Sequence, residues 1–388
     1  MKRISNIYKD VCDIDNIIHM TDMVLSKIRN KNKKEEFILH KIEHIANIKE
    51  RLESKNIEFN EYNIFLITDP KCRIILSQNI EDKIINHLIA KHILIRTFES
   101  KFIDSMCATR LGRGTSYAIK LMKKYINEIK LKYNNFYILK IDIKKYFYNI
   151  DHNVLKGILK KHIKDKDALK ILNIIIDSTN DDYINKKIEK LKNNRIKILN
   201  DELLIKETNE LPFYKIGKGC GIGDMTSQSF GLLYLMEICH YIKEELHIKY
   251  FINFMDDFIL IHEDKDYLKY CLNVIRNKLL NEYKLEINSK TRIYSIKEGV
   301  EFLGFRFILK NNKLILKLRN KNKIKFKNQI KILKQLKDYK YINDKKYNMI
   351  LSSLKGHLQY GNCKNLYIKN VNIKKIENIF YDKEKVLI

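Results

Sequence analysis

Two adjacent carboxylates, Asp256 and Asp257, follow Phe254 and Met255 between two short apolar runs. These runs, 248–253 and 258–262, are β-branched and aromatic, which predicts two strands joined by a tight turn. Neighbouring carboxylates at a hairpin tip repel each other, and a bound divalent cation would offset that repulsion. The pair therefore indicates either a metal site or a solvated acidic turn, and the tetrapeptide alone favours neither.

A third acid, Asp142, comes at the end of an apolar strand predicted over 136–143. A buried strand should not end on a carboxylate that has no partner. A metal ion shared with the 254–257 hairpin would supply one, and a salt bridge to a lysine is the alternative. Two metal ions about 4 Å apart can activate an attacking hydroxyl and stabilise a leaving phosphate oxygen. Such a site takes carboxylates from separate elements, so we expect Asp142, Asp256 and Asp257 to converge.

Two further segments carry groups suited to phosphate. A hairpin predicted over 62–76 presents Lys71 and Arg73 near its bend, where cations could grip a triphosphate, although an ordinary basic turn is the alternative. The segment 217–223 contains four of the chain's 12 glycines, which let the backbone pass close to a ligand. Ser227 and Gln228 follow it, at the start of a predicted helix. Together with the three acids, this is the layout of a nucleotidyl transferase that works on a template.

The composition favours a polyanionic partner. The 388 residues carry a formal net charge of +28, which indicates nucleic acid, although heavy use of Lys, Asn and Ile also reflects an AT-rich coding sequence. The seven cysteines are scattered without metal-ligand spacing, as expected of reduced thiols in the cytosol. We find no apolar run of about 18 residues and no secretory signal. We therefore expect a cytoplasmic protein that does not contact a membrane.

The rest of the chain supplies elements to position these groups. We expect two or three structural units. Helices are predicted within 1–60, over 81–104, 117–130, 154–162 (with Asp151 as its N-cap), 229–245 and 265–282, and through the lysine-rich segment 317–388. A further hairpin is predicted over 301–307, with Gly304 at its centre. The polar segment 180–210 is interpreted as an insertion at the surface.

In their order and residue patterns, these motifs resemble those of the reverse transcriptases, specifically the bacterial branch of group II intron-like and diversity-generating-retroelement enzymes. The resemblance runs from about residue 62 to 365. Residues 142–147 match the first palm motif, and 254–257 match the (Tyr/Phe)-x-Asp-Asp motif, with Phe where Tyr is usual. Residues 222–228 match the aliphatic-GxxxSQ form of diversity-generating elements, and 302–305 match the primer grip.

The resemblance implies an α+β fold, a right-hand polymerase whose palm is an antiparallel sheet backed by helices. The expected parts are an N-terminal helical extension (1–60), fingers (61–135), a palm (136–309, with the 180–210 insertion) and a helical thumb (310–388). It also implies two Mg²⁺ ions, with Mn²⁺ as an alternative. The implied metal site comprises Asp142, Ile143, Asp256 and Asp257.

Roles for the other residues are likewise implied by the resemblance. Phe147 would be the steric gate that blocks a 2′-hydroxyl and so favours dNTPs. Lys290 would act in catalysis by protonating the leaving pyrophosphate. The implied nucleotide-binding residues are Lys71, Arg73, Ser227 and Gln228, with Gln228 contacting the incoming nucleotide or the template. Phe302, Leu303 and Gly304 would form the primer grip.

The implied function is RNA-directed DNA polymerase, which copies an RNA template from a DNA or RNA primer, with an accessory protein or a second copy of the chain as further partners. Two contexts stay open: a diversity-generating retroelement, and an anti-phage defence enzyme with a dedicated structured noncoding RNA. Asp224 replaces the usual Asn of the GxxxSQ region, and two elements typical of retron enzymes are absent. A catalytically inactive RNA-binding protein is disfavoured by the three carboxylates, and an RNA-dependent RNA polymerase by Phe147.

Overall fold

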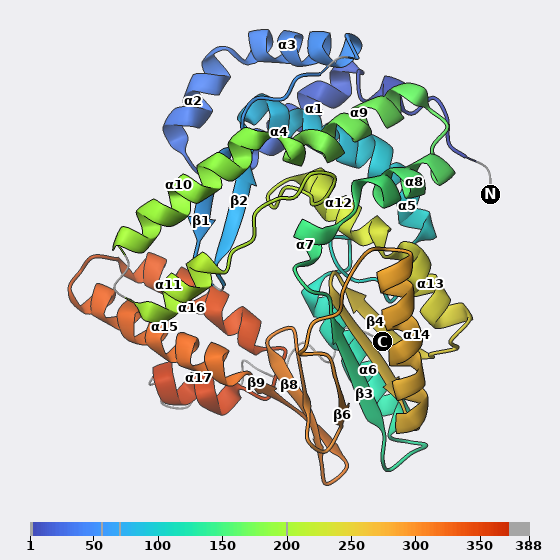
Figure 1. Cartoon of the computed structure of the whole chain (residues 1–388). Helices are drawn as coiled ribbons and strands as arrows, with labels where there is room; N and C mark the ends of the chain where they lie inside the picture. The colour runs from blue at the N-terminus through green and yellow to red at the C-terminus, as the bar shows by residue number, and fades with distance from the viewer. Residues whose placement is uncertain (1–2, 56, 70, 199–200, 372–388) are drawn as a thin grey trace. The chain divides into compact units, whose positions relative to one another are not determined.

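The computed structural model describes residues 3–55, 57–69, 71–198 and 201–371 (Figure 1). The chain forms two compact units, each assembled from segments that are far apart in the sequence. The first unit contains Met1–Gly114, Ile141–Phe258 and Tyr270–Thr291, and the second contains Thr115–Lys140, Ile259–Lys269 and the described residues from Arg292 onward. Asp142, Asp256 and Asp257 all belong to the first unit.

The first unit begins with the helices expected within residues 1–60. These are α1 (Ile14–Lys27), α2 (Lys31–Leu39) and α3 (Lys41–Glu53). Asp13 and Asn30 cap α1 and α2, because their side-chain oxygens accept the N–H groups of Asn16 and Lys33. Helices α1 and α3 pack on α4 (Ile80–Ile89), which continues through a π-helical segment, Ala90–Ile95, into α5 (Arg96–Phe98) (Figure 1).

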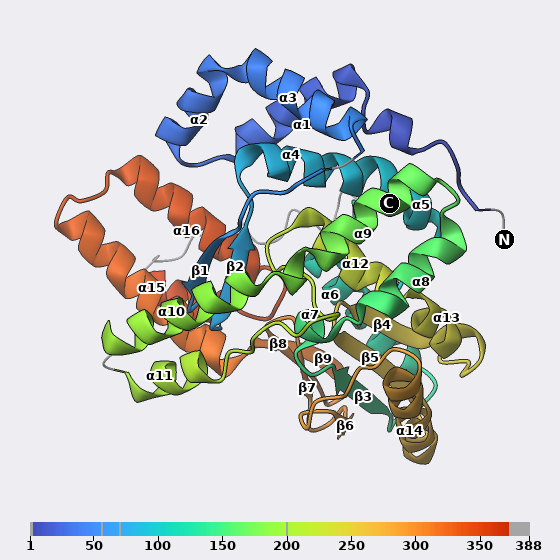
Figure 2. The same ribbon diagram turned by 45° about the horizontal axis from the view of Figure 1, so that its top comes forward.

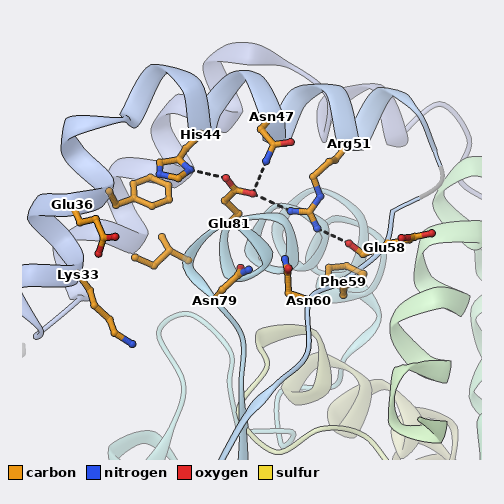
Figure 3. Close-up of a pocket in the computed structure, with 12 residues that line it drawn as sticks. Lys33, Glu36, His44, Asn47, Arg51, Glu58, Phe59, Asn60, Asn79 and Glu81 are labelled. Atoms are coloured by element: carbon orange, nitrogen blue, oxygen red, sulfur yellow. Dashed lines mark hydrogen bonds and ion pairs between the residues drawn. The ribbon is translucent and has the colours of Figure 1, made fainter. Parts of the chain in front are cut away.

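A cluster of polar contacts ties α3 to α4 (Figure 3). His44 Nδ1 lies 2.6 Å from Glu81 Oε1, and Asn47 donates to Glu81 Oε2 at 2.8 Å. Arg51 donates to Glu81 Oε2 and to the fully buried Asp82 Oδ1. A pocket of about 730 Å³ opens beside the cluster and is lined by residues of α2, α3 and the start of α4. These contacts fix the N-terminal helices to the helix that follows the first hairpin.

That hairpin consists of β1 (Asn63–Ile67) and β2 (Arg73–Ser77), which pair antiparallel as predicted. Its buried side packs on Ile184 and Ile188 from α10 (Asp182–Ile198), which lies beside β1 in Figures 1 and 2. Both isoleucines are fully buried and lie about one helical turn apart. The interpretation of 180–210 as a polar surface segment is therefore wrong for this face of α10.

The remaining helices of this part of the chain match the sequence prediction at 152–162 and 265–281, whereas those at 146–149, 166–177 and 202–209 were not predicted. In chain order, the remaining helices are α7 (Tyr146–Asn149), α8 (His152–His162), α9 (Lys166–Asp177), α11 (Glu202–Asn209), α12 (Met225–Tyr234), α13 (Met236–Glu244) and α14 (Lys265–Asn281). Asp151 caps α8 as predicted, because its Oδ1 accepts the N–H groups of Asn153 and Val154. The single helix predicted over 229–245 is instead two helices, separated at Leu235, and the first begins at Met225.

A four-stranded sheet contains β3 (Tyr137–Asp142), β4 (Tyr250–Phe254), β5 (Asp257–His262) and β6 (Arg292–Ser295) in the order β4-β5-β3-β6. Strand β3 pairs antiparallel with β6, so that Leu139 lies opposite Ile293. Strands β4 and β5 are neighbours, as the predicted hairpin requires. Strands β3 and β5 each have one end in each compact unit.

The second unit combines helices with a three-stranded antiparallel sheet. Its elements are α6 (Thr115–Ile129), β7 (Val300–Phe302), β8 (Phe305–Lys310), β9 (Lys313–Leu318), α15 (Asn320–Asp338), α16 (Asp344–Leu358) and α17 (Lys364–Val371). Leu303 and Gly304 form the β7–β8 turn with φ of +46° and +87°, as a two-residue type I′ turn requires. The hairpin predicted over 301–307 is confirmed, whereas 372–388 of the predicted thumb lie outside the described residues.

Mixed helix and antiparallel sheet are thus confirmed as the fold class. Among the described residues, we find no helix with the length and apolar character needed to span a bilayer.

Candidate active site

The β4–β5 turn presents Asp256 beside Asp257. Met255 takes a left-handed conformation, with φ of +55°, which a two-residue hairpin turn demands at its first position. Asn253 holds this turn in place: its side-chain amide donates to the Met255 carbonyl at 2.6 Å, and its backbone exchanges hydrogen bonds with Ser105 and Cys107. Sequence reasoning missed Asn253. The available signal was a polar amide inside an otherwise apolar strand.

The end of β3 brings Asp142 to this turn. The N–H of Ile143 donates to the Asp256 carbonyl at 3.2 Å. On its other side, the Asp142 carbonyl accepts the N–H of Asn288 at 2.6 Å, and the Asp142 N–H donates to Thr291 Oγ1 at 3.3 Å. Backbone contacts on both sides therefore fix the position from which the Asp142 carboxylate projects.

The electrostatics of Asp256 reflect this convergence. The pKa of its half-buried carboxyl is raised to about 6, chiefly by burial and also by the negative charges of Asp257 and Asp142, although Lys71 lowers it. Interaction with both other acids means that the three carboxylates share one electrostatic environment. The effect of Lys71 places a cation of the β1–β2 turn within reach of the same group.

Phe147 lies on the short helix α7, which starts after Lys145 in a left-handed conformation. Its ring packs against α12 at Gly231, where a Cβ atom would lie only 3.0 Å from Phe147 Cε1. The neighbouring Tyr146 donates its hydroxyl to the Gly231 carbonyl at 2.5 Å. Because Gly231 has no side chain, the half-buried Phe147 ring can seat against the helix in a fixed position.

The other predicted site residues differ in exposure. Ser227 is buried and Gln228 is exposed on the first turn of α12, and Lys71, Arg73 and Lys290 are exposed. Lys290 follows Asn288, whose Oδ1 accepts the Lys290 N–H at 3.1 Å, so this segment is joined to the Asp142 backbone. Phe302, Leu303 and Gly304 belong to the second unit, where they form the β7–β8 turn.

A family model described as "Reverse transcriptase (RNA-dependent DNA polymerase)" matches residues 68–307, more than half of the chain and all three acids. The chain belongs to the reverse transcriptase family. The description of that model names RNA-dependent DNA polymerase as the activity of the family. No curated protein matches the chain.

Solved structures of telomerases are also similar. A telomerase from Candida tropicalis truncated from its C-terminal domain shares 16% identity over 67% of this chain, with a TM-score of 0.43. A telomerase from Candida albicans, in complex with a fragment of telomeric RNA, shares 13% identity over 83%, also with a TM-score of 0.43. This reverse transcriptase covers 55% and 62%, respectively, of the lengths of those chains.

Reverse transcriptases as a family use divalent metal ions, and the donor set here suits a hard cation. The site supplies carboxylate oxygens at a turn where like charges and burial disfavour ionisation. Within the described ranges, no group of three or more His, Cys, Asp or Glu side chains is arranged to hold an ion by itself. Mg²⁺ usually needs only one or two carboxylates, because substrate phosphates and water complete its coordination. The residues present therefore fit such an ion.

Replacing Lys71 with Ala should raise the KM for dNTPs by about tenfold and change kcat much less, because a lost phosphate contact mainly weakens substrate binding. The measurement is primer extension on an RNA template over a range of dNTP concentrations. Lys31→Ala, an exposed lysine at the start of α2, is the matched control and should leave KM unchanged. An unaltered KM for Lys71→Ala would remove this lysine from the nucleotide site.

Proposed function

We propose that this reverse transcriptase makes cDNA from an RNA template by two-metal nucleotidyl transfer. The observation that carries the proposal is the junction of β3 with the β4–β5 turn, where Ile143 hydrogen-bonds to Asp256. At this junction two separate elements contribute carboxylates, as a two-ion site needs. The raised pKa of Asp256, which responds to both other acids, supports the same assignment.

In this mechanism Asp142, Asp256 and Asp257, with Ile143, would hold two Mg²⁺ ions, with Mn²⁺ as the alternative. The bound ions would activate the primer 3′-hydroxyl and stabilise the departing pyrophosphate.

Lys71 and Arg73 bind the triphosphate, and Ser227 and Gln228 form the helix start that contacts the incoming nucleotide or template. Lys290 donates a proton to the pyrophosphate. The primer is held by the β7–β8 turn, which comprises Phe302, Leu303 and Gly304.

The chain's positive charge supports a nucleic-acid partner, with a net formal charge of +28. We therefore propose an RNA template and a DNA or RNA primer as its partners, with dNTPs as substrates. An accessory protein or a second copy of the chain is a further proposed partner, and the proposed location is the cytoplasm.

For the biological role, we propose a diversity-generating retroelement or a similar bacterial element, on the basis of the aliphatic-GxxxSQ pattern at 222–228. The second candidate is an anti-phage defence enzyme that copies a dedicated structured noncoding RNA. Two departures from the retroelement pattern weaken the first role: Asp224 stands where Asn is usual, and the 180–210 segment is longer than expected.

One experiment tests the activity and separates the two roles. The protein is purified from its native host, and both its bound RNA and the DNA it makes from that RNA are sequenced. We expect DNA complementary to one bound RNA, made only with a divalent ion and dNTPs. Template sequence from a variable repeat beside the gene would support diversification. A structured noncoding RNA without such a repeat would support defence. Absence of complementary DNA in every condition would overturn the proposed function.

A further inference from the structure

Asp224 occupies an unusual place at the start of α12. It is the N-cap residue, with extended backbone, and its side chain is 3% exposed. Aspartates at this position normally accept backbone N–H groups of the first helical turn, as Asp151 and Asp165 do in α8 and α9. The Asp224 side chain makes no such bond. Its carboxylate must therefore have another structural use, since burying it is costly.

The Asp224 side chain instead bonds to the residue that precedes the first hairpin. Tyr62, immediately before β1, donates its hydroxyl to Asp224 Oδ2 at 2.9 Å, although the two residues are 162 positions apart. Tyr62 is itself 4% exposed and firmly held. Its hydroxyl lies 3.1 Å from Ser178 Oγ, and its backbone N–H donates to the Tyr183 hydroxyl. Tyr62 is therefore a fixed anchor for Asp224.

The second strand of the hairpin contacts the same glycine loop. The N–H of Leu76 in β2 donates to the Ile222 carbonyl at 2.9 Å. Gly223 has φ of +142°, and a Cβ atom there would lie 2.3 Å from the Leu76 carbonyl oxygen. Only glycine permits this approach of the two backbones. Residues 222–224 are thus joined to β2 and to the residue just before β1, at the hairpin that carries Lys71 and Arg73.

We propose that Tyr62 and Asp224 are positioning residues that hold the glycine loop on the β1–β2 hairpin, and that ionisation of Asp224 weakens this hold. They thereby fix the position of Gln228, at the start of α12, relative to the cations of the β1–β2 turn. This inference rests on the proposed roles of Lys71 and Gln228 in binding the incoming nucleotide. Neither Tyr62 nor Asp224 is a catalytic residue in this scheme.

The charge state of Asp224 follows from its surroundings. The titratable and charged groups that act on it or respond to it are Tyr62, Tyr183, Tyr214, Cys220, Asp82 and Lys83. The pKa of Asp224 is raised to about 7, chiefly by burial and also by the charge of Asp82, although the Tyr62 hydrogen bond and Lys83 lower it. We call the glycine loop closed when residues 222–224 are held on the hairpin, and open when they separate from it and become hydrated. Because the pKa of Asp224 is raised in the closed loop, its carboxyl binds a proton more tightly there than in the open loop. By linkage, increasing pH from about 6 to about 8 must favour the open loop.

The test compares wild type with Asp224→Asn, which keeps an acceptor for Tyr62 but cannot ionise, and with Tyr62→Phe, which removes the donor. KM and kcat for a dNTP are measured on an RNA template between about pH 6 and about pH 8. Over this range KM should rise by about tenfold more in wild type than in Asp224→Asn. Tyr62→Phe should raise KM by about tenfold at every pH, with a smaller change in kcat.

Tyr8→Phe is the matched control, because it removes another buried tyrosine hydroxyl, which donates to the Leu52 carbonyl within the N-terminal helices. It should retain the wild-type pH dependence, which includes any titration of the dNTP itself. If Asp224→Asn keeps the full rise of KM, or Tyr62→Phe leaves KM unchanged, the positioning role is refuted.

A second readout needs no polymerase activity, so it separates this inference from the proposed function. The thermal unfolding midpoint of wild type should fall from about pH 6 to about pH 8 more steeply than that of Asp224→Asn, since only wild type buries a charge on ionisation. Parallel curves for the two proteins would overturn the assignment, even if DNA synthesis proceeds normally.

Discussion

Replacing Asp256 with Asn should abolish DNA synthesis, with a loss of at least about a thousandfold in kcat, while RNA binding persists. Asparagine matches the shape of aspartate but supplies no charge to hold an ion between the Asp142 strand and the β4–β5 turn. Primer extension at saturating Mg²⁺ and dNTP measures the first effect, and titration of labelled RNA measures the second. In the proposed function, RNA binding comes mainly from the positive charge of the chain, which this substitution does not lower.

The same variant should be at least as stable as wild type near pH 7. Burial and the charges of Asp257 and Asp142 raise the pKa of Asp256 to about 6, so the ionised side chain costs folding free energy above that pH. Asparagine removes this cost. A loss of activity accompanied by an undiminished unfolding temperature would identify Asp256 as a residue kept for chemistry at the expense of stability.

Asp266→Asn is the control for the charge change, because Asp266 is an exposed aspartate at the start of α14 whose carboxylate pairs with Lys269. It should leave synthesis and RNA binding unchanged. Synthesis by Asp256→Asn near the wild-type rate would remove Asp256 from the metal site. Loss of RNA binding together with a lowered unfolding temperature would instead show that the substitution disrupts the fold.

Local sequence patterns predicted the elements of this site well. The β-branched and aromatic runs on either side of the Asp256 turn and the glycine at 304 each indicate a hairpin, because turn geometry and strand composition are properties of a few consecutive residues. Asp151 was likewise recognisable as a helix cap. The expectation that Asp142 meets Asp256 came from the chemistry of a two-ion site and not from local pattern, because β3 and β5, which are neighbours in the sheet, are more than a hundred residues apart in the chain.

Pairings between distant segments could not be predicted locally. Ile184 and Ile188 occur in a mostly polar helix, and only the face presented by the β1–β2 hairpin explains why both are buried. The bond between Tyr62 and Asp224 spans 162 positions, and the sequence showed only that Asp224 departs from the usual Asn. The sequence marks Asn253 only as a polar residue in an apolar strand, and its role follows from the hydrogen bond that its amide donates to the Met255 carbonyl.

Replacing Phe147 with Val should reduce discrimination against rNTPs by about a hundredfold, which corresponds to about 3 kcal/mol in the relative transition-state binding of the two sugars. In the proposed role the Phe147 ring fills the space that a 2′-hydroxyl would need. Its seat against Gly231 of α12, where even a methyl group would lie 3.0 Å from the ring, keeps it from moving aside. The shorter valine leaves that space open.

The measurement is kcat/KM for a dNTP and for the rNTP with the same base, on one RNA template and primer. Tyr146→Phe is the matched control: it removes the hydroxyl that bonds to the Gly231 carbonyl but preserves both rings between α7 and α12. We expect this control to retain sugar discrimination even if overall activity falls. If Phe147→Val selects dNTPs as strongly as wild type, Phe147 is not the gate. If both variants lose discrimination equally, the packing of α7 on α12 controls the sugar pocket, and the Phe147 ring alone does not.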